Sequence, residues 1–322
     1  MGRIGLEHPF CPRCFASIGQ AAACPSCALP FDRSGALLDV LGSRARERRA
    51  EEVERFYTKS PFPGYAPGDD GASLLDRSRR APFLVALDAA IAPDARVLDL
   101  GCGTAQVPAF LALAASHRTV VGIDGCRESL AHAEEFRARA VVDNLQLVRA
   151  DLFDLPVEPR SFQVVISRGV VHHTPDPDDA IAKVAECVAP GGVLVLGWYE
   201  TAGRLFHCAR RALGRLRGQP IRALDPLLRR RDMDDEKKRI WIEDQYLHPL
   251  EHILPLPHVL PLLDSLGLHW IRSIPPATRG EGLFDPTPRP SAMGIRRLQL
   301  AWALRGLNDP DAGLVCVVAR RA

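Results

Sequence analysis

Long apolar runs are missing from this sequence of 322 residues. No window approaches the run of about 18 consecutive apolar residues that a membrane-spanning helix needs. Residues 1–10 also lack the basic start and apolar stretch of a secretory signal. We therefore expect a cytoplasmic protein with no transmembrane segment, while peripheral contact with a membrane stays open.

The sequence also has no large excess of positive or negative charge. Lysine is scarce. The formal net charge is +2 at pH 7, which points to no class of partner. The basic residues are 37 arginines and only four lysines, an imbalance that we attribute to genome base composition. Hydrophobic residues make up 47% and charged residues 25%, as in an ordinary globular protein that can bury a core without disulfides.

Four of the nine cysteines form two close pairs near the N-terminus. Two residues separate Cys11 from Cys14 and Cys24 from Cys27, and nine residues separate the pairs. Each pair bends the chain so that two thiolates point to one centre, and four thiolates complete a tetrahedral Zn²⁺ site with no open position. We therefore predict a structural zinc ribbon over residues 1–35. The alternative is a set of redox pairs or unligated thiols.

Residues from 93 onward alternate short apolar runs with helical segments. Runs rich in Val, Ile and Leu without polar alternation are typical of buried parallel strands. The alternation predicts an α/β, doubly wound, mostly parallel seven-stranded sheet with helices on both faces. We assign 93–322 to this domain, with an insertion at about 200–255, and 36–92 to a helical N-terminal segment that could form a lid. The expected strands lie at 97–100, 119–123, 145–148, 162–166, 193–197, 268–274 and 314–319.

Acidic residues follow three consecutive expected strands. Asp99 opens the stretch Asp-Leu-Gly-Cys-Gly-Thr (99–104), whose glycines allow a tight turn and close approach of a ligand to the backbone. A carboxylate there suits a cationic ligand group better than a pyrophosphate. Asp124 can accept hydrogen bonds from both ribose hydroxyls, and Asp151 from the exocyclic amine of adenine. A nicotinamide-binding domain is disfavoured, because Gln106 stands where its third glycine should be.

These stretches resemble the motifs of class I S-adenosylmethionine-dependent methyltransferases over roughly residues 80–200. The two adjacent histidines are similar to those of quinone-biosynthesis methyltransferases and their small-molecule relatives. The resemblance rests on Val-Leu-Asp-Leu-Gly-Cys-Gly-Thr (97–104), Val-Val-Gly-Ile-Asp (120–124), Ala-Asp-Leu-Phe-Asp-Leu-Pro (150–156), Phe-Gln-Val-Val-Ile-Ser (162–167), Val-Val-His-His-Thr-Pro-Asp-Pro (170–177) and Ala-Pro-Gly-Gly-Val-Leu-Val-Leu (189–196).

The resemblance implies S-adenosylmethionine as cofactor. Asp99 and the glycines would hold its methionine part, Asp124 its ribose, and Asp151 with Leu152 its adenine. The chain departs from the family at Ala105, where glycine is usual and a methyl group could alter how closely the loop wraps the cofactor. The cysteine pairs are similar to a zinc ribbon that precedes a ribosomal RNA guanine methyltransferase and helps it bind RNA. The other implied cofactor residues are Gly101, Cys102, Gly103, Thr104 and Ser167.

The acceptor is expected at the ends of the fourth and fifth strands. There His172 or His173 could accept a proton from the acceptor as the methyl group moves. Capping, packing, or catalysis by placement alone are the alternatives. A lid formed by Pro61–Tyr65 would add Tyr65 to the site. The insertion would add Gln245, Tyr246, His248 and His252.

Residues 204–231 are rich in arginine, with nine arginines and one acidic residue, Asp225. Such a basic segment is most often a solvated face, but it can also contact an anionic membrane or phosphates. If the segment is helical, one face would collect Leu205, Ala209, Ala212, Leu213 and Leu216.

The sequence thus predicts methyl transfer to a small-molecule or lipid-like acceptor. RNA base methylation is the enzymatic alternative, supported by the cysteine pairs and the arginines. Against it, Ser167-Arg-Gly-Val stands where amino-group methylation of bases often uses an Asn-Pro-Pro-Tyr signature. A non-catalytic, cofactor-binding regulator is the third interpretation.

Overall fold

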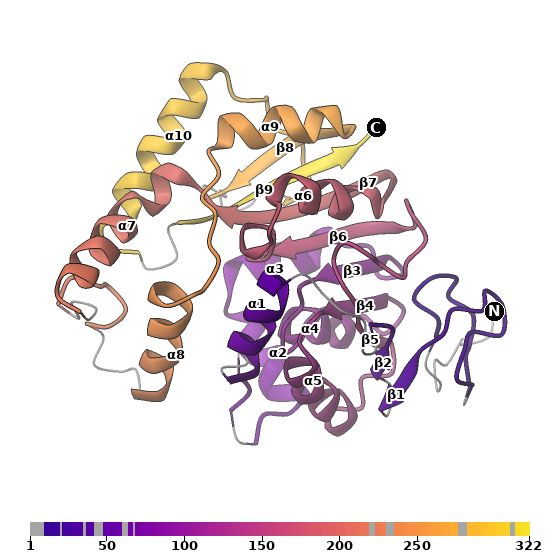
Figure 1. Cartoon of the computed structure of the whole chain (residues 1–322). Helices are drawn as coiled ribbons and strands as arrows, with labels where there is room; N and C mark the ends of the chain where they lie inside the picture. The colour runs from indigo at the N-terminus through magenta and orange to yellow at the C-terminus, as the bar shows by residue number, and fades with distance from the viewer. Residues whose placement is uncertain are drawn as a thin grey trace.

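The computed structural model describes residues 10–19, 21–34, 37–41, 48–59, 64–66, 68–218, 223–229, 235–275, 282–309 and 313–322. One sheet runs through the molecule, with helices on both of its faces (Figure 1). Among these residues, no helix is both long and apolar enough to span a bilayer.

The sheet confirms the doubly wound, mostly parallel architecture, and all seven expected strands are present. The central strands pair in parallel in the order β5-β4-β3-β6-β7, and β9 lies antiparallel between β7 and β8. The seven strands are β3 (Arg96–Leu100), β4 (Thr119–Asp124), β5 (Leu145–Arg149), β6 (Phe162–Arg168), β7 (Val188–Tyr199), β8 (Leu268–Ile274) and β9 (Leu314–Arg321).

The described sheet has nine strands rather than the expected seven, because the N-terminal segment extends it. β1 (Asp32–Ser34) and β2 (Leu37–Asp39) pair antiparallel, and β2 pairs in parallel with β5. Strands of three residues leave no readable pattern in the sequence. The predicted domain boundary at residue 35 lies between these two paired strands.

The cysteine-bearing segment before β1 packs directly against the sheet. The Phe10 N–H donates to Oε1 of Gln146 on β5 at 3.2 Å. The ring of Phe15 meets the ring of Phe162 on β6 edge to face, with 5.6 Å between centroids. The Arg96 guanidinium lies over the Phe15 ring, 4.3 Å from its centroid. The segment therefore shares an apolar core with the sheet.

The helices cover the sheet in two groups, each with its own buried core. One core joins a sheet face to α2, α3, α4 and α5, and the other joins the opposite face to α6, α9 and α10. The helices are α1 (Arg48–Lys59), α2 (Gly71–Arg79), α3 (Pro82–Ala90), α4 (Gln106–Ala114), α5 (Arg127–Arg139), α6 (Pro177–Glu186), α7 (Thr201–Leu216), α8 (Asp235–Tyr246), α9 (Leu256–Ser265) and α10 (Ala292–Arg305), with a short 3-10 turn at Val171–His173.

Candidate cofactor and acceptor site

The loop after β3 adopts a conformation that requires its glycines. Gly101 has φ +74°, and a Cβ on it would lie 2.3 Å from Cγ2 of Val170. Gly103 has φ +55°, and its N–H donates to Oδ2 of Asp124 at 2.8 Å. Ala105 also has a left-handed backbone, with φ +58°, and it is buried. This conformation explains why glycine is usual at that position, since a side chain there is strained.

A cavity of about 510 Å³ opens at the carboxyl ends of β3, β4, β5 and β6. The topology places the ends of these parallel strands together, which is where open α/β sheets bind ligands. Seven of the nine predicted cofactor residues line the cavity: Asp99, Gly101, Cys102, Gly103, Asp124, Asp151 and Leu152. The structure therefore brings together the three acidic residues that the sequence placed on separate strands.

Thr104 and Ser167 lie outside the cavity lining. Thr104 is fully buried, and its carbonyl oxygen accepts a hydrogen bond from the Tyr65 hydroxyl at 2.9 Å. Ser167 is also fully buried. Its neighbours Ile166 and Arg168 line the cavity, and Ser167 faces the other way because side chains alternate along a strand.

Burial perturbs the carboxyl group of Asp99 in the cavity. Burial raises its pKa from 3.8 to about 7, and the nearby Asp124 carboxylate adds to the rise. The Arg168 guanidinium acts in the opposite direction. A cationic ligand group beside Asp99 would restore the ionised form, so the site is suited to an ammonium or sulfonium.

Of the two predicted catalytic histidines, His173 lines the cavity and His172 does not. The Nδ1–H of His173 donates to the Leu250 carbonyl oxygen at 2.7 Å, which leaves Nε2 without a proton in the neutral ring. Burial, with a further contribution from His248, lowers the pKa of His173 well below its usual value. His173 is thus a neutral hydrogen-bond acceptor at the cavity wall.

His172 and three of the insertion residues lie around this wall rather than in the cavity lining. The centroid of the His173 ring lies 4.1 Å from that of the buried His172 ring and 3.8 Å from that of the His248 ring. The His252 N–H donates to the His172 carbonyl oxygen at 2.8 Å. The Tyr246 hydroxyl donates to Oδ2 of Asp225 at 2.6 Å. Among the predicted insertion residues, Gln245 reaches the cavity.

The prediction of Tyr65 in a lid over the acceptor needs correction. Its ring stacks on Phe136 of α5 with centroids 4.2 Å apart, and its hydroxyl holds the glycine-rich loop through Thr104. Tyr65 therefore braces the loop from outside the cavity. Residues 61–63 of the expected lid lie outside the described residues.

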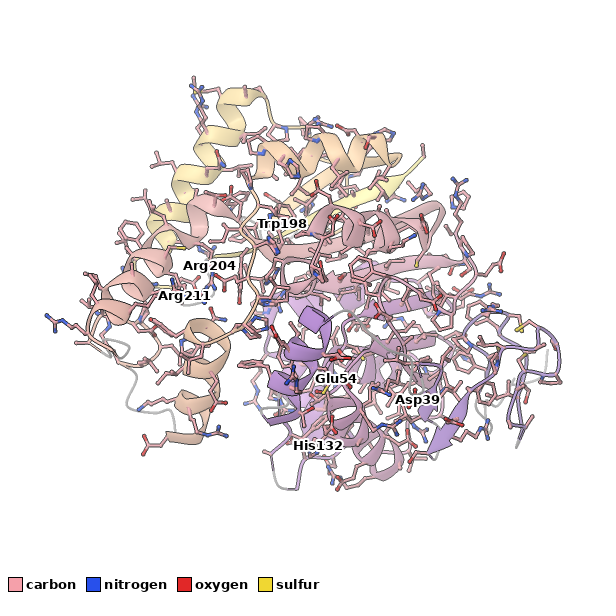
Figure 2. The ribbon with its side chains drawn as sticks, viewed as in Figure 1. Asp39, Glu54, His132, Trp198, Arg204 and Arg211 are labelled. Atoms are coloured by element: carbon pink, nitrogen blue, oxygen red, sulfur yellow. The ribbon has the colours of Figure 1, made fainter. Side chains whose placement is uncertain are left out.

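Several cavity residues were missed in the sequence. Helix α1, within the predicted 36–92 segment, contributes Val53, Glu54 and Tyr57 to the cavity lining, whereas the lid loop was expected at Pro61–Tyr65. Its helical spacing was readable, but its destination depends on contacts far away in the sequence. Glu54 accepts a hydrogen bond from Arg149 of β5 at 2.8 Å, and Arg149 also pairs with Asp39 of β2. Figure 2 labels the two acidic partners, Glu54 and Asp39. The other missed wall residues include Phe83, Arg168, Tyr199 and Trp241.

A buried arginine fixes the insertion against the cavity wall. Arg204 of α7 is 1% exposed, and its guanidinium lies 3.5 Å over the Tyr199 ring. It donates to Oε1 of Gln245 at 2.6 Å and pairs with Glu251 at 2.7 Å. Gln245 in turn donates to the Tyr199 hydroxyl at 2.8 Å. Two cavity residues are thus held in place by one arginine from the basic segment.

The four paired cysteines converge as predicted. Their Sγ atoms all lie within 4.8 Å of one another, with 3.6 Å between Cys11 and Cys27 and 3.5 Å between Cys14 and Cys24. Four sulfurs bound at 2.3 Å to one tetrahedral ion would lie ~3.8 Å apart, so the set fits Zn²⁺. All nine cysteines lie among the described residues, and none of them is in a disulfide.

Comparison with known proteins bears directly on this site. A family model described as a methyltransferase domain matches residues 98–196, which include the glycine-rich loop, the acidic strand ends and both histidines. The match confirms the predicted likeness to methyltransferases over these residues.

Curated relatives match the methyltransferase domain over part of their length. The 27-O-demethylrifamycin SV methyltransferase of Amycolatopsis mediterranei is 32% identical over 149 residues, which are 46% of this chain and 54% of that protein. The tRNA U34 carboxymethyltransferase of Methylococcus capsulatus is 38% identical over 112 residues, or 34% of each chain. The chain spans roughly a third to a half of the length of the curated relatives it matches.

Among solved structures, the methyltransferase domain shares its fold with geranyl diphosphate C-methyltransferase of Streptomyces coelicolor A3(2). The TM-score is 0.51 with 13% identity, and the match covers 87% of this chain and 100% of that chain. This likeness confirms the Rossmann-like methyltransferase fold.

Proposed function

We propose that this chain transfers the methyl group of S-adenosylmethionine to a small organic acceptor. The observation that carries the proposal is the continuity of one cavity. It joins the acidic strand ends Asp99, Asp124 and Asp151 to a wall made by His173, Tyr199 and Trp241. A cofactor at the first group would present its sulfonium methyl to an acceptor beside the second.

The site residues divide the chemical work between binding and proton removal. Asp99 would face the ammonium of the methionine part, Asp124 the ribose and Asp151 the adenine. The aromatic wall would exclude water and position the acceptor for in-line attack, which supplies much of the acceleration. For a hydroxyl acceptor, its oxygen bonds the methyl carbon as the carbon–sulfur bond breaks, S-adenosylhomocysteine leaves, and Nε2 of His173 takes the proton.

We also propose that the four paired cysteines hold a structural Zn²⁺. The four converging sulfurs support this proposal and leave no open position for a reacting ligand. The other five cysteines are not in disulfides either, which also supports a cytoplasmic location, where thiols stay reduced.

Titration of the purified protein with S-adenosylhomocysteine tests the cofactor site. We expect binding in the wild type and a loss of about 1.5–3 kcal/mol in Asp124→Ala, since hydrogen bonds to a charged group are removed. Glu135→Gln on the exposed surface of α5 is the control and should leave the affinity unchanged. Binding of NAD with no response to S-adenosylhomocysteine would contradict the proposal.

The assay for catalysis measures formation of S-adenosylhomocysteine from S-adenosylmethionine in the presence of panels of phenols, carboxylic acids and quinols. With an accepted compound, His173→Ala should lower kcat by roughly 10²-fold and leave cofactor affinity unchanged, since the removed group acts on the acceptor. His172→Ala should have a smaller effect on kcat. Equal losses in the two variants would refute the assignment of the proton acceptor to His173.

RNA remains a second candidate acceptor because one relative is named a tRNA carboxymethyltransferase. The structure weakens the support from the arginine-rich segment. Arg204 and Arg211 both pair with Glu251, and Arg210 donates to the Gly306 carbonyl oxygen. Turnover on bulk cellular RNA that exceeds turnover on every small compound would favour this candidate.

A further inference from the structure

Helix α7 exposes its apolar face and turns its polar face inward. Its five apolar residues at helical spacing, Leu205, Ala209, Ala212, Leu213 and Leu216, are all exposed, and Leu216 is 84% exposed. An amphipathic helix ordinarily buries that stripe against the core. Here the inner side carries arginines instead, and Figure 2 shows Arg204 and Arg211 on the side turned toward α8 and the sheet.

The inward polar face has buried partners that explain the orientation. The Glu251 carboxylate accepts hydrogen bonds from Arg204 at 2.7 Å and from Arg211 at 3.0 Å. The Nε2–H of His207 donates to the Gln245 carbonyl oxygen at 3.0 Å. Rotating the helix to bury its leucines would leave the Glu251 carboxylate buried without a counterion. The exposed stripe is therefore a consequence of the network around the cavity wall.

Helix α10, which packs against α7, carries exposed apolar residues of its own. Met293, Leu300 and Leu304 are exposed, with Leu300 62% exposed, and Trp302 is buried on the opposite side of the helix. The end of α10 meets α7 where Arg210 donates to the Gly306 carbonyl oxygen at 3.1 Å. Figure 1 shows the two helices together along one edge of the molecule.

The charged residues of these two helices all have one sign. Neither α7 nor α10 contains an acidic residue. Four exposed arginines lie next to the apolar stripes: Arg215 near the end of α7, Arg217 just after it, and Arg296 and Arg297 on α10. A fifth exposed arginine, Arg305 of α10, pairs with Asp309. Exposed leucines bordered by cations are the pattern of a surface that lies on an anionic membrane.

We propose that the α7–α10 surface, made of the exposed residues of these two helices, docks on an anionic lipid surface. The leucines would enter the boundary between headgroups and acyl chains, and the four arginines would contact lipid phosphates. A symmetric contact between two copies would bring arginines toward arginines, which disfavours self-association. RNA would use the arginines but leave the apolar side chains in water. The proposal does not depend on methyl transfer, because it rests on the outer faces of the helices.

Sedimentation of the full-length protein with vesicles tests the proposal. We expect binding to phosphatidylcholine vesicles that contain about one third phosphatidylglycerol, and much weaker binding to phosphatidylcholine alone. Leu216→Ser with Leu300→Ser, and separately Arg296→Gln with Arg297→Gln, should each weaken binding by roughly tenfold or more. Val141→Ser and Arg139→Gln, at exposed positions in and after α5, are the matched controls and should bind as the wild type does.

Three outcomes would overturn the proposal. The first is equal binding to charged and neutral vesicles, or none to either. The second is a dimer in sedimentation velocity that Leu216→Ser with Leu300→Ser dissociates, which would assign the surface to a second copy. The third is retention of bulk RNA that Arg296→Gln with Arg297→Gln abolishes while vesicles stay unbound. Circular dichroism of each variant distinguishes lost docking from lost folding.

Discussion

Replacement of Arg204 by methionine should destabilise the fold by about 3 kcal/mol. The substitution keeps an unbranched side chain but removes the charged hydrogen bond to Gln245, the ion pair with Glu251 and the cation over Tyr199. Hydrogen bonds to charged groups contribute about 1.5–3 kcal/mol each, and breaking a buried ion pair costs about 3–5 kcal/mol. The lower part of that range applies, because Glu251 keeps Arg211 at 3.0 Å.

Replacement of Glu251, the partner of Arg204, should lower the free energy of unfolding more than replacement of Arg204 does. The order of the losses among the variants therefore tests the reasoning. Glu251→Gln leaves both Arg204 and Arg211 without their shared carboxylate, so we expect a loss of about 3–5 kcal/mol. Arg80→Met is the control: its ion pair with Asp76 is exposed on both sides, and we expect a change of about 0.5 kcal/mol or less.

Urea unfolding of the three variants measures the free energies directly. The double variant of Arg204 and Glu251 should lose less than the sum of the two single losses, by about 0.5–3 kcal/mol, because the residues interact. A loss in Arg204→Met as small as that in Arg80→Met would refute the structural role of this network. Losses of unfolding free energy that simply add in the double variant would also refute it.

Two further predictions concern the cofactor site and the paired cysteines. The folded protein without ligand keeps the Asp99 proton up to about pH 7, so affinity for S-adenosylhomocysteine should rise with pH up to that point and then level. Calorimetry at pH 6 in two buffers of different ionisation enthalpy should show proton release, which Asp99→Asn should abolish; equal heats in the wild type would count against it. Protein purified without added zinc should hold one zinc per chain, and Cys11→Ser should lower the unfolding temperature of the whole domain because this segment shares the core of the sheet. Cys208→Ser is the thiol control, and a metal content near zero in reduced protein would exclude the site.

The part of the site that the sequence predicted is the part built from local segments. A strand, the residue that ends it and the turn that follows are contiguous, so Asp99, Asp124 and Asp151 could be assigned to one sheet edge from their spacing alone. The histidines could be placed near the edge for the same reason. Which of them faces the cavity depends on the hydrogen bond between His173 and Leu250, 77 residues later in the chain.

The missed parts all depend on contacts between distant segments. Arg204 belongs to a run of arginines that is typical of a solvated face, and nothing near it in the sequence shows that Gln245 and Glu251 will surround it. Tyr65 follows prolines that suggested a lid, but its stacking on Phe136 decides its position. Charge and apolar spacing predicted a helical segment where α1 lies, but they could not show that α1 lines the cavity.

Two arginine–carboxylate networks connect the parts outside the central methyltransferase domain to the cavity. On the side of Asp151, Arg149 bridges Asp39 of the N-terminal hairpin and Glu54 of α1. On the side of His173, Arg204 bridges Glu251 and Gln245 of the insertion. A guanidinium suits this task because its planar donors bind two partners at fixed angles, which an ammonium does not. The same use of arginine on the inner side of α7 turns the leucines outward, so the construction of the cavity wall and the exposure of the α7–α10 surface have one cause.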